Sequence, residues 1–180
     1  MKQITTIVAI SGSLKSTSAN TNILRAMAKI APENISIKIV EGLDQLPHFN
    51  PEITEDILVV THFRNQIKAA DGVVFSTPEY AFGVPGVLKN ALDWLVSSGE
   101  LNDKPVAAIS VSPMHTGGDK ALASLLLTLS ALGTNTTQNA SLAIGAIKSK
   151  MNEAGEITNP ETLQELNAVL TALLESIHPK

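Results

Sequence analysis

Short apolar runs alternate along the chain with longer segments in which apolar residues recur every three or four positions. The short runs are rich in Ile, Val and Thr, which is typical of buried strands. We predict strands at residues 4–10, 35–40, 72–77, 105–111 and 136–143. The longer segments predict amphipathic helices at residues 22–30, 55–70, 84–96, 120–132 and 160–177. Residues 57–60 alone would also suit a strand, but Phe63, Ile67 and Ala70 continue a helical period.

Strands that alternate with helices in this way indicate a parallel sheet with helices packed on both of its faces. Five strands suit the flavodoxin-like fold, a three-layer α/β/α sandwich with a parallel sheet in the order 2-1-3-4-5. Residues 1–180 are expected to form a single domain, because domains usually contain ~100–200 residues. In such a sheet the loops after strands one, three and four meet at the carboxyl edge, where α/β proteins bind their ligands.

The composition narrows the chemistry that this fold can perform. The chain contains no Cys, which excludes disulfides, thiolate metal sites, iron–sulfur clusters and a Cys nucleophile, so redox chemistry would need a bound cofactor. The net charge of −4 comes without a basic stripe, so nucleic acid is not an expected partner. No apolar run approaches ~18 residues, and the N-terminus does not resemble a signal peptide. We therefore expect no membrane segment and a cytoplasmic location.

The first of the three junctions is crowded with hydroxyl and amide side chains. It runs from Ser11 to Asn20, between the first predicted strand and the first predicted helix. Free N–H groups and a partial positive charge at a helix N-terminus attract phosphate, and Lys15 adds a full positive charge. With a single Gly, the segment is neither a Walker loop nor a G-x-G-x-x-G fingerprint. The residues alone favour a phosphate site and a simple helix cap by Ser18 or Asn20 about equally.

Two further junctions follow the third and fourth predicted strands. The junction from Pro78 to Pro85 is rich in Pro and Gly, and its unpaired backbone groups are placed to grip a polar, planar ligand. The junction from Ser112 to Gly118 ends in a Gly pair, which lets the backbone approach a flat ring closely. His115 in this loop is either a ligand contact or an exposed loop residue. The other histidines share no metal-ligand spacing and are expected at the surface.

Taken together, the junctions resemble those of the NADPH-dependent FMN reductases, a flavodoxin-like family that includes azo, quinone and chromate reductases. The resemblance is carried by Gly12-Ser13-Leu14 with the basic residue and Ser18-x-Asn20 after it, by Pro78-Glu79-Tyr80, and by Pro85-Gly86-x-Leu88-Lys89-Asn90-Ala91-x-Asp93-Trp94. It implies bound FMN, NADPH or NADH as reductant, and hydride transfer to FMN followed by electron transfer to a quinone, azo, chromate or flavin acceptor. It also implies a homodimer or homotetramer, in which helix 84–96 with Trp94 and the segment after Gly118 would supply the contact.

The resemblance assigns cofactor contacts to all three junctions. The first would hold the FMN phosphate, the second would wrap the flavin ring, and the third would meet the pyrimidine edge of that ring. The residues expected at the cofactor are Ser13, Lys15, Ser18, Ala19, Asn20, Pro78, Glu79, Tyr80, Ala81, Ser112, His115, Thr116 and Gly117. No catalytic side chain and no metal are expected, because the cofactor carries the hydride chemistry.

Two of these residues depart from the family pattern. Lys15 stands where Arg is usual, and a Lys offers a point charge without the bidentate fork. Ala81 replaces a usual Asn and so removes an amide side chain. Two alternatives to the enzyme stay open. One is a flavodoxin-like electron carrier, which would share the phosphate loop but serve protein partners, and the other is a flavin-binding module without turnover.

Overall fold

Five parallel strands form one sheet in the order β2-β1-β3-β4-β5 in the computed structural model, which describes residues 4–53 and 55–179. The strands are β1 (Thr5–Ser11), β2 (Ile35–Ile39), β3 (Gly72–Thr77), β4 (Val106–Val111) and β5 (Ser141–Ile144). Each pairs in parallel with its neighbours; Val73 of β3, for example, lies between Val8 of β1 and Val106 of β4. This confirms the strand order and the flavodoxin-like architecture predicted from the sequence.

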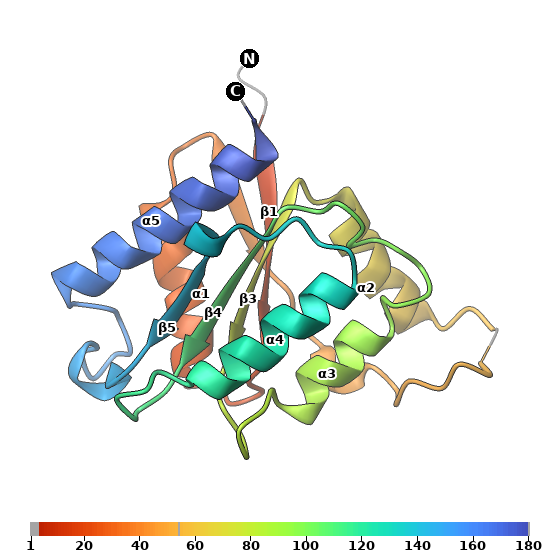
Figure 1. Ribbon diagram of the computed structural model, residues 1–180, viewed down its shortest axis with the longest axis horizontal. Coiled ribbons are helices and arrows are strands. Elements are labelled where there is room, and N and C mark those ends of the chain that lie inside the picture. The colour runs from red at the N-terminus through yellow and green to blue at the C-terminus, as the bar shows by residue number, and fades with distance from the viewer. Residues whose placement is uncertain (1–3, 54, 180) are drawn as a thin grey trace.

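Helices cover both faces of the sheet (Figure 1). They are α1 (Ala19–Ile30), α2 (Leu58–Ala69), α3 (Gly86–Asp93), α4 (Asp119–Ala131) and α5 (Pro160–Ile177). Buried side chains of α1 and α5 pack in one core on one face, and those of α2, α3 and α4 pack in a second core on the other face. The fold is therefore the expected three-layer sandwich.

The sequence of β3 explains why both faces need a cover. All six of its residues are buried, and Val73 and Phe75 join the core of α2, α3 and α4 while Val74 joins the core of α1 and α5. A polar side chain in the middle of this strand would lose its water without gaining a partner. Burial of a side chain as large as Phe75 stabilises the fold by about 1.5–3 kcal/mol.

Most elements begin and end within a few residues of their predicted limits, and α5 matches its predicted range. The ambiguous segment 57–60 is helical from Leu58 onward, so α2 starts three residues later than predicted. Similarly, α1 begins at Ala19 rather than at residue 22. The third helix is shorter than the predicted 84–96, because Pro85 is its N-cap and the chain leaves the helix after Asp93.

The last strand is the clearest correction to the predicted elements. In place of a strand over 136–143, β5 covers only Ser141–Ile144 beside β4. Asn135 forms an isolated bridge to Pro105, and a short 3-10 turn at Gln138–Ala140 separates this bridge from β5. Thr residues favour strands in general, so the Thr-rich sequence before the turn predicted a longer strand than the chain forms.

Parallel strands bring the loops after β1, β3 and β4 to one edge of the sheet, at the bottom of Figure 1. The yellow-green loop after β3 projects beyond the sheet there. At the opposite edge, Thr5 Oγ1 and His178 Nε2 share a hydrogen bond of 2.9 Å, so the start of β1 lies beside the end of α5. Among the described residues, none of the helices combines the length and the apolar character needed to cross a membrane.

Candidate functional site

The loop between β1 and α1 ends at a capped helix N-terminus. Ser18 is the N-cap of α1, and its Oγ accepts a hydrogen bond of 3.2 Å from the backbone N–H of Asn20. The capping role considered for Ser18 is thus confirmed. Within residues 4–53 and 55–179, the backbone N–H groups of Ser16, Thr17 and Ala19 have no protein acceptor. These donors and the positive end of the helix dipole can bind an anion.

Behind the loop, Asn20 has a structural partner that sequence reasoning missed. Its side chain is buried, and Oδ1 accepts a hydrogen bond of 2.9 Å from Ser76 Oγ on β3. This bond ties the first turn of α1 to the neighbouring strand. Ser13 is half-buried and Lys15 is exposed, and both border open space at the carboxyl edge. The loop therefore keeps Asn20 inside and presents Ser13 and Lys15 outside.

The loop after β3 forms a tight hairpin from Tyr80 to Gly83. These two residues exchange two backbone hydrogen bonds of 3.0 Å, each N–H donating to the other's carbonyl oxygen. Between them, Ala81 and Phe82 have φ angles of 49° and 62°, the left-handed pair that a type I′ turn requires. Asn and Gly are favoured there, whereas Ala carries a strain of about 1–2 kcal/mol. The Asn that is usual in the resembling family thus has a backbone explanation as well as a side-chain one.

This hairpin carries two exposed aromatic rings at the sheet edge. Tyr80 is 59% exposed and Phe82 is 78% exposed, which is unusual for large aromatic side chains. Ala81 is also exposed, and Pro78 is half-buried at the base of the hairpin. Exposed rings can contact a planar ligand over a large area.

Glu79 points toward helix α4. Its Oε2 accepts hydrogen bonds of 3.0 Å from the backbone N–H groups of both Lys120 and Ala121. The helix begins after Gly118, which has no side chain to cap it. Glu79 therefore acts as the cap from a distance, with its negative charge at the positive end of the helix. The Gly at the N-cap was the only sequence signal that another residue must cap α4, and it does not reveal which acidic residue does so.

The loop after β4 is anchored to the end of β5. Ser112 Oγ accepts a hydrogen bond of 3.1 Å from the N–H of Met114, and Ser110 Oγ donates to the carbonyl oxygen of Gly117 at 2.8 Å. Gly117 has a φ of 69°, and a Cβ on it would lie 2.9 Å from the carbonyl carbon of Ala143. Its lack of a side chain is thus needed for packing against β5. His115 and Thr116 are exposed at the tip of this loop.

An exposed ion pair follows this loop at the start of α4. Lys120 Nζ lies 3.0 Å from Asp119 Oδ2. The hydrogen bond from Lys120 lowers the pKa of the Asp119 carboxyl, and the same bond raises the pKa of the Lys120 ammonium. Both groups therefore stay charged at neutral pH, next to the N–H donors that Glu79 already occupies.

The remaining motif residues, on α3 and after it, have structural roles. Lys89 and Asp93 form the ordinary helix pair considered for them, with Nζ and Oδ1 2.6 Å apart. Trp94 is buried, and its Nε1 donates to the carbonyl oxygen of Pro47 at 2.8 Å. Asn90 Nδ2 donates to the same oxygen at 3.0 Å. These residues fasten α3 to the loop after β2 and leave the ligand edge to the three junctions.

The histidines do not form a metal site. The side chains of His48, His62, His115 and His178 are exposed, as expected for all but His115. In the part of the chain that the structure describes, no group of three or more His, Cys, Asp and Glu side chains could hold a metal ion.

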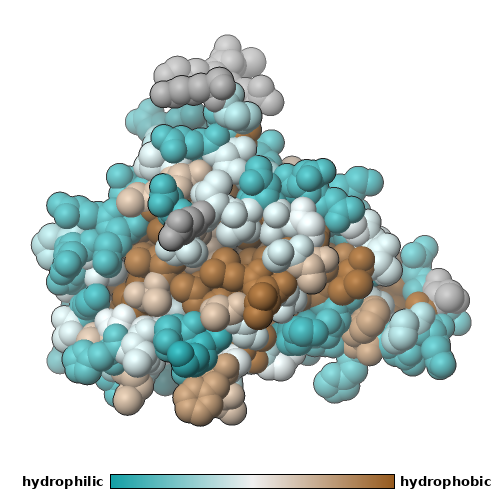
Figure 2. Space-filling model, viewed as in Figure 1, coloured by the Kyte–Doolittle hydropathy of each residue, from teal (hydrophilic) through white to brown (hydrophobic). Residues whose placement is uncertain are grey.

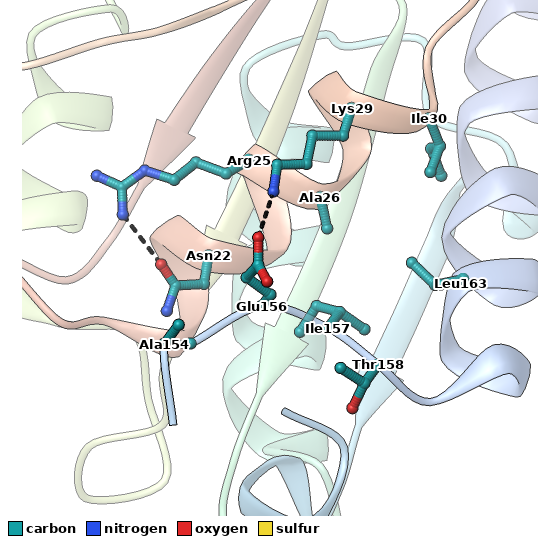
Figure 3. A pocket seen from close by; sticks show the side chains of 11 residues that line it. Asn22, Arg25, Ala26, Lys29, Ile30, Ala154, Glu156, Ile157, Thr158 and Leu163 are labelled. Carbon is teal, nitrogen blue, oxygen red and sulfur yellow. Dashed lines mark hydrogen bonds and ion pairs between the residues drawn. The ribbon is translucent and has the colours of Figure 1, made fainter. Parts of the chain in front are cut away.

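Two hollows matter for the position of a ligand. The larger, of about 460 Å³, runs along α1 from Asn22 to Ile30 and faces the turn 154–158 (Figure 3). It contains none of the predicted cofactor residues, and the Lys29–Glu156 ion pair lies at its rim. A second hollow, of about 380 Å³, borders the first junction and includes Ser13 and Lys15. The unpaired N–H donors of Ser16, Thr17 and Ala19 belong to the loop that borders this second hollow, at the carboxyl edge of the sheet.

Along that edge the three loops offer two kinds of contact. The first loop supplies backbone N–H groups, the Ser13 hydroxyl and the Lys15 ammonium, a donor set that fits a phosphate monoester. The other two supply exposed rings at Tyr80 and Phe82 and open backbone near Thr116, which fit a flat heterocycle. A ligand with a phosphate at one end and a ring system at the other, such as FMN, fits this sequence of contacts.

A model of the NADPH-dependent FMN reductase family matches residues 5–148 of the chain. This range contains all three loops and every residue predicted at the cofactor.

Curated relatives resemble the chain along nearly their whole length. A quinone reductase from Pseudomonas putida is 34% identical over 166 residues, which covers 88% of each chain. A quinone reductase from Escherichia coli K12 is 33% identical over 183 residues, covering 95% of this chain and 94% of the relative. Among solved structures, FerB, a flavoenzyme NAD(P)H:(acceptor) oxidoreductase from Paracoccus denitrificans, superposes with a TM-score of 0.87 at 26% identity and 97% coverage of both chains. The similarity thus spans the sheet and all three loops.

Proposed function

The chain belongs to the NADPH-dependent FMN reductase family and is an NAD(P)H-dependent, FMN-containing oxidoreductase, and from this premise we propose how its carboxyl edge holds the cofactor. The FMN phosphate lies at the first loop, where Ser13, Lys15 and the backbone N–H groups of Ser16, Thr17 and Ala19 hold it with charge-assisted hydrogen bonds. The flavin ring lies between the hairpin Tyr80–Gly83 and the tip of loop 112–118. The unpaired backbone donors at the start of α1 carry this arrangement.

The predicted cofactor residues divide into those that face the ligand and those that hold the loops. Pro78, Tyr80, Ala81, His115 and Thr116 are half-buried or exposed, and in the proposed arrangement they border the flavin ring. The supporting residues have partners within the protein: Ser18, Asn20, Glu79, Ser112 and Gly117. They set the loop shapes from behind.

FMN held by these loops would supply the redox chemistry, which is uptake of a hydride from NAD(P)H and release of electrons to a second substrate. The role of the protein is to leave one face of the flavin ring open, so that the two substrates can bind there one after the other. This arrangement predicts ping-pong kinetics. The exposed rings of Tyr80 and Phe82 border that face and exclude water from a stacked planar substrate. We propose a quinone as the acceptor, on the support of the two quinone reductases that resemble the chain.

The absorption spectrum of the purified protein tests this function. We expect flavin bands that bleach under anaerobic NADPH and return when benzoquinone is added. Bands that NADPH leaves unchanged would favour the electron carrier over the enzyme. Bands that bleach but do not return with any quinone would contradict the proposed acceptor while leaving the reductase activity in place.

We also propose that the protein forms a homodimer or homotetramer. Figure 2 shows an apolar patch over α4 that continues toward the end of α3. Leu127 of α4 is 75% exposed and Val96 is 63% exposed, whereas Trp94, predicted in this contact, lies inside the chain's own core at 4%. An isologous contact between copies would cover the patch. Light scattering at micromolar concentration tests this: Leu127→Lys should lower the mass, and a monomer mass for the unaltered protein would exclude it.

We further propose that residues 1–180 act as one domain in the cytoplasm. The support for one domain is that a single sheet, with a core on each face, includes elements from residue 5 to residue 177. One cooperative unfolding transition and recovery of the protein in the cytosolic fraction are the expected results. Two separate unfolding transitions would contradict the single domain, and recovery in another fraction would contradict the cytoplasmic location.

A further inference from the structure

The hollow of about 380 Å³ beside the first loop extends away from the proposed flavin ring. Ser13 and Lys15 form one wall, Arg25 of α1 forms another, and residues 39–44 after β2 form the third. Because β2 lies beside β1 on the side opposite to β3, this hollow continues the carboxyl edge past the phosphate position. Its volume is within the range of small-molecule sites.

Four charged side chains border this hollow. Lys15 and Arg25 are positive, and Glu41 and Asp44 are negative. None of the four belongs to an ion pair within the described ranges. Arg25 Nη1 donates to Asn22 Oδ1 at 3.0 Å, which is its one side-chain hydrogen bond to another described residue. Most of the guanidinium is therefore free to bind a ligand.

This set of side chains selects a class of ligand. The guanidinium of Arg25, next to the Lys15 ammonium that the FMN phosphate also uses, can bind phosphate oxygens, and the carboxylates can accept hydrogen bonds from the hydroxyls of a sugar. Leu14, which is 59% exposed, and the half-buried Ile39 add apolar surface that suits the face of a purine. Inorganic phosphate alone would make no use of the carboxylates, and a free base would make no use of the cations. A nucleotide uses the cations, the carboxylates and the apolar surface.

We propose that this hollow binds an adenosine 5′-phosphate group, an inference that rests on the proposed position of the FMN phosphate. Two ligands could supply the group. In FAD it is joined to the FMN phosphate itself, so it would start at the loop that forms a wall of the hollow. In NAD(P)H it is joined to the nicotinamide half, which must reach the flavin ring at the same time. The chemistry of recognition is the same in both cases.

Isothermal titration of the FMN-loaded protein with AMP tests the site directly. We expect AMP to bind, and Arg25→Ala to weaken that binding by about tenfold, since a charge-assisted contact is lost. Lys29→Ala is the matched control. It removes a cation from the same helix, but Lys29 pairs with Glu156 at 2.7 Å and does not border this hollow. Figure 3 shows the Arg25 side chain extending away from that pair.

Titrations of the apoprotein with FMN and FAD identify the source of the group. If it is FAD, FAD binds at least about tenfold more tightly than FMN, and Arg25→Ala removes this advantage without weakening FMN. If it is NAD(P)H, FAD has no advantage, and Arg25→Ala raises the KM for NAD(P)H about tenfold with an unchanged kcat.

A single pattern of results would overturn the proposal. In it AMP fails to bind the FMN-loaded protein at millimolar concentration, FAD binds no better than FMN, and Arg25→Ala behaves as Lys29→Ala does. Failure of the unaltered protein to bind FMN at all would be a different result, because it would contradict the proposed function rather than this site.

Discussion

The first loop and the hairpin after β3 lie on the same edge of the sheet but are built in opposite ways. The first loop leaves the backbone N–H groups of Ser16, Thr17 and Ala19 unpaired within the described residues and directs Lys15 outward. The hairpin Tyr80–Gly83 pairs its own backbone groups and carries left-handed φ angles at its tip. One region offers hydrogen-bond donors, and the other offers shape and aromatic surface.

In the proposed binding mode, this difference means that the two ends of FMN are held by different forces. Charge-assisted hydrogen bonds at the first loop weaken with added salt, because salt screens exposed charges. Contacts with the rings of the hairpin depend on buried apolar area, which moderate salt changes little. Substitutions in the first loop should therefore separate FMN from riboflavin, and substitutions in the hairpin should affect both flavins alike.

The largest effect is expected from the first loop. The double variant Ser13→Ala, Lys15→Ala should weaken FMN about a hundredfold or more, because each hydrogen bond to a charged group contributes about 1.5–3 kcal/mol. Asn20 is left intact, since its bond to Ser76 supports the loop. Binding of riboflavin, which lacks the phosphate, should be weakened far less when both flavins are titrated by fluorescence quenching. Lys38→Ala, which removes an exposed cation from β2, is the control. Equal losses for both flavins would move the phosphate to another place.

Thermal unfolding measures the same contrast without any substitution. FMN at about 100 times its dissociation constant should stabilise the fold by roughly 2.7 kcal/mol, provided that the unfolded chain does not bind it. Riboflavin at the same concentration should raise the melting temperature less, because it cannot use the first loop. A melting temperature that saturating FMN leaves unchanged would contradict the cofactor assignment.

Glu79 tests the hairpin side of the comparison. Glu79→Ala removes the acceptor for two N–H groups of α4 and should lower the free energy of unfolding by about 1–3 kcal/mol. Urea unfolding of the flavin-free protein measures this change. Glu79→Gln keeps one acceptor oxygen and should cost less. The affinities for FMN and riboflavin should fall equally. A loss of affinity for FMN alone would show that Glu79 acts at the phosphate instead.

The smallest effect is expected at Ala81. Ala81→Gly and Ala81→Asn should each stabilise the fold by up to about 1 kcal/mol, because both residues tolerate a positive φ better than Ala does. If the Asn side chain also contacts the flavin, Ala81→Asn alone should change turnover or flavin affinity, by at most about tenfold. Steady-state NADPH oxidation with a quinone distinguishes the two. Identical kinetics for the three proteins would show that only the backbone matters here.

The sequence was sufficient to predict the fold because the central strands β3 and β4 are buried on both faces. The run 72–77 is apolar almost throughout, and α5 has a clear helical period between Pro160 and Ile177, so both were predicted within their observed limits. At β5 the prediction was wrong, because a 3-10 turn at Gln138–Ala140 interrupts a segment of strand-forming residues. Local preference cannot report such an interruption when tertiary contacts impose it.

The sequence predicted which loops meet but not which way each side chain in them points. Glu79 caps a helix that starts 40 residues later, and Asn20 bonds to Ser76 on another strand. Such contacts depend on the register of the whole sheet, which motif spacing does not encode. The charged hollow around Arg25 escaped sequence reasoning for the same reason, since its walls come from separate segments of the chain.

The hydrogen bond between Thr5 and His178 has a practical consequence for this redox protein. It holds the first strand and the last helix together at the edge opposite the three loops (Figure 1). Anchoring the molecule to an electrode through a linker at either end would therefore orient every copy with the three loops, the proposed flavin site, toward the solution. Current measured in that arrangement would report on substrates that diffuse freely to the exposed edge. Direct electron transfer between the cofactor and the electrode would then have to cross the full length of the sheet.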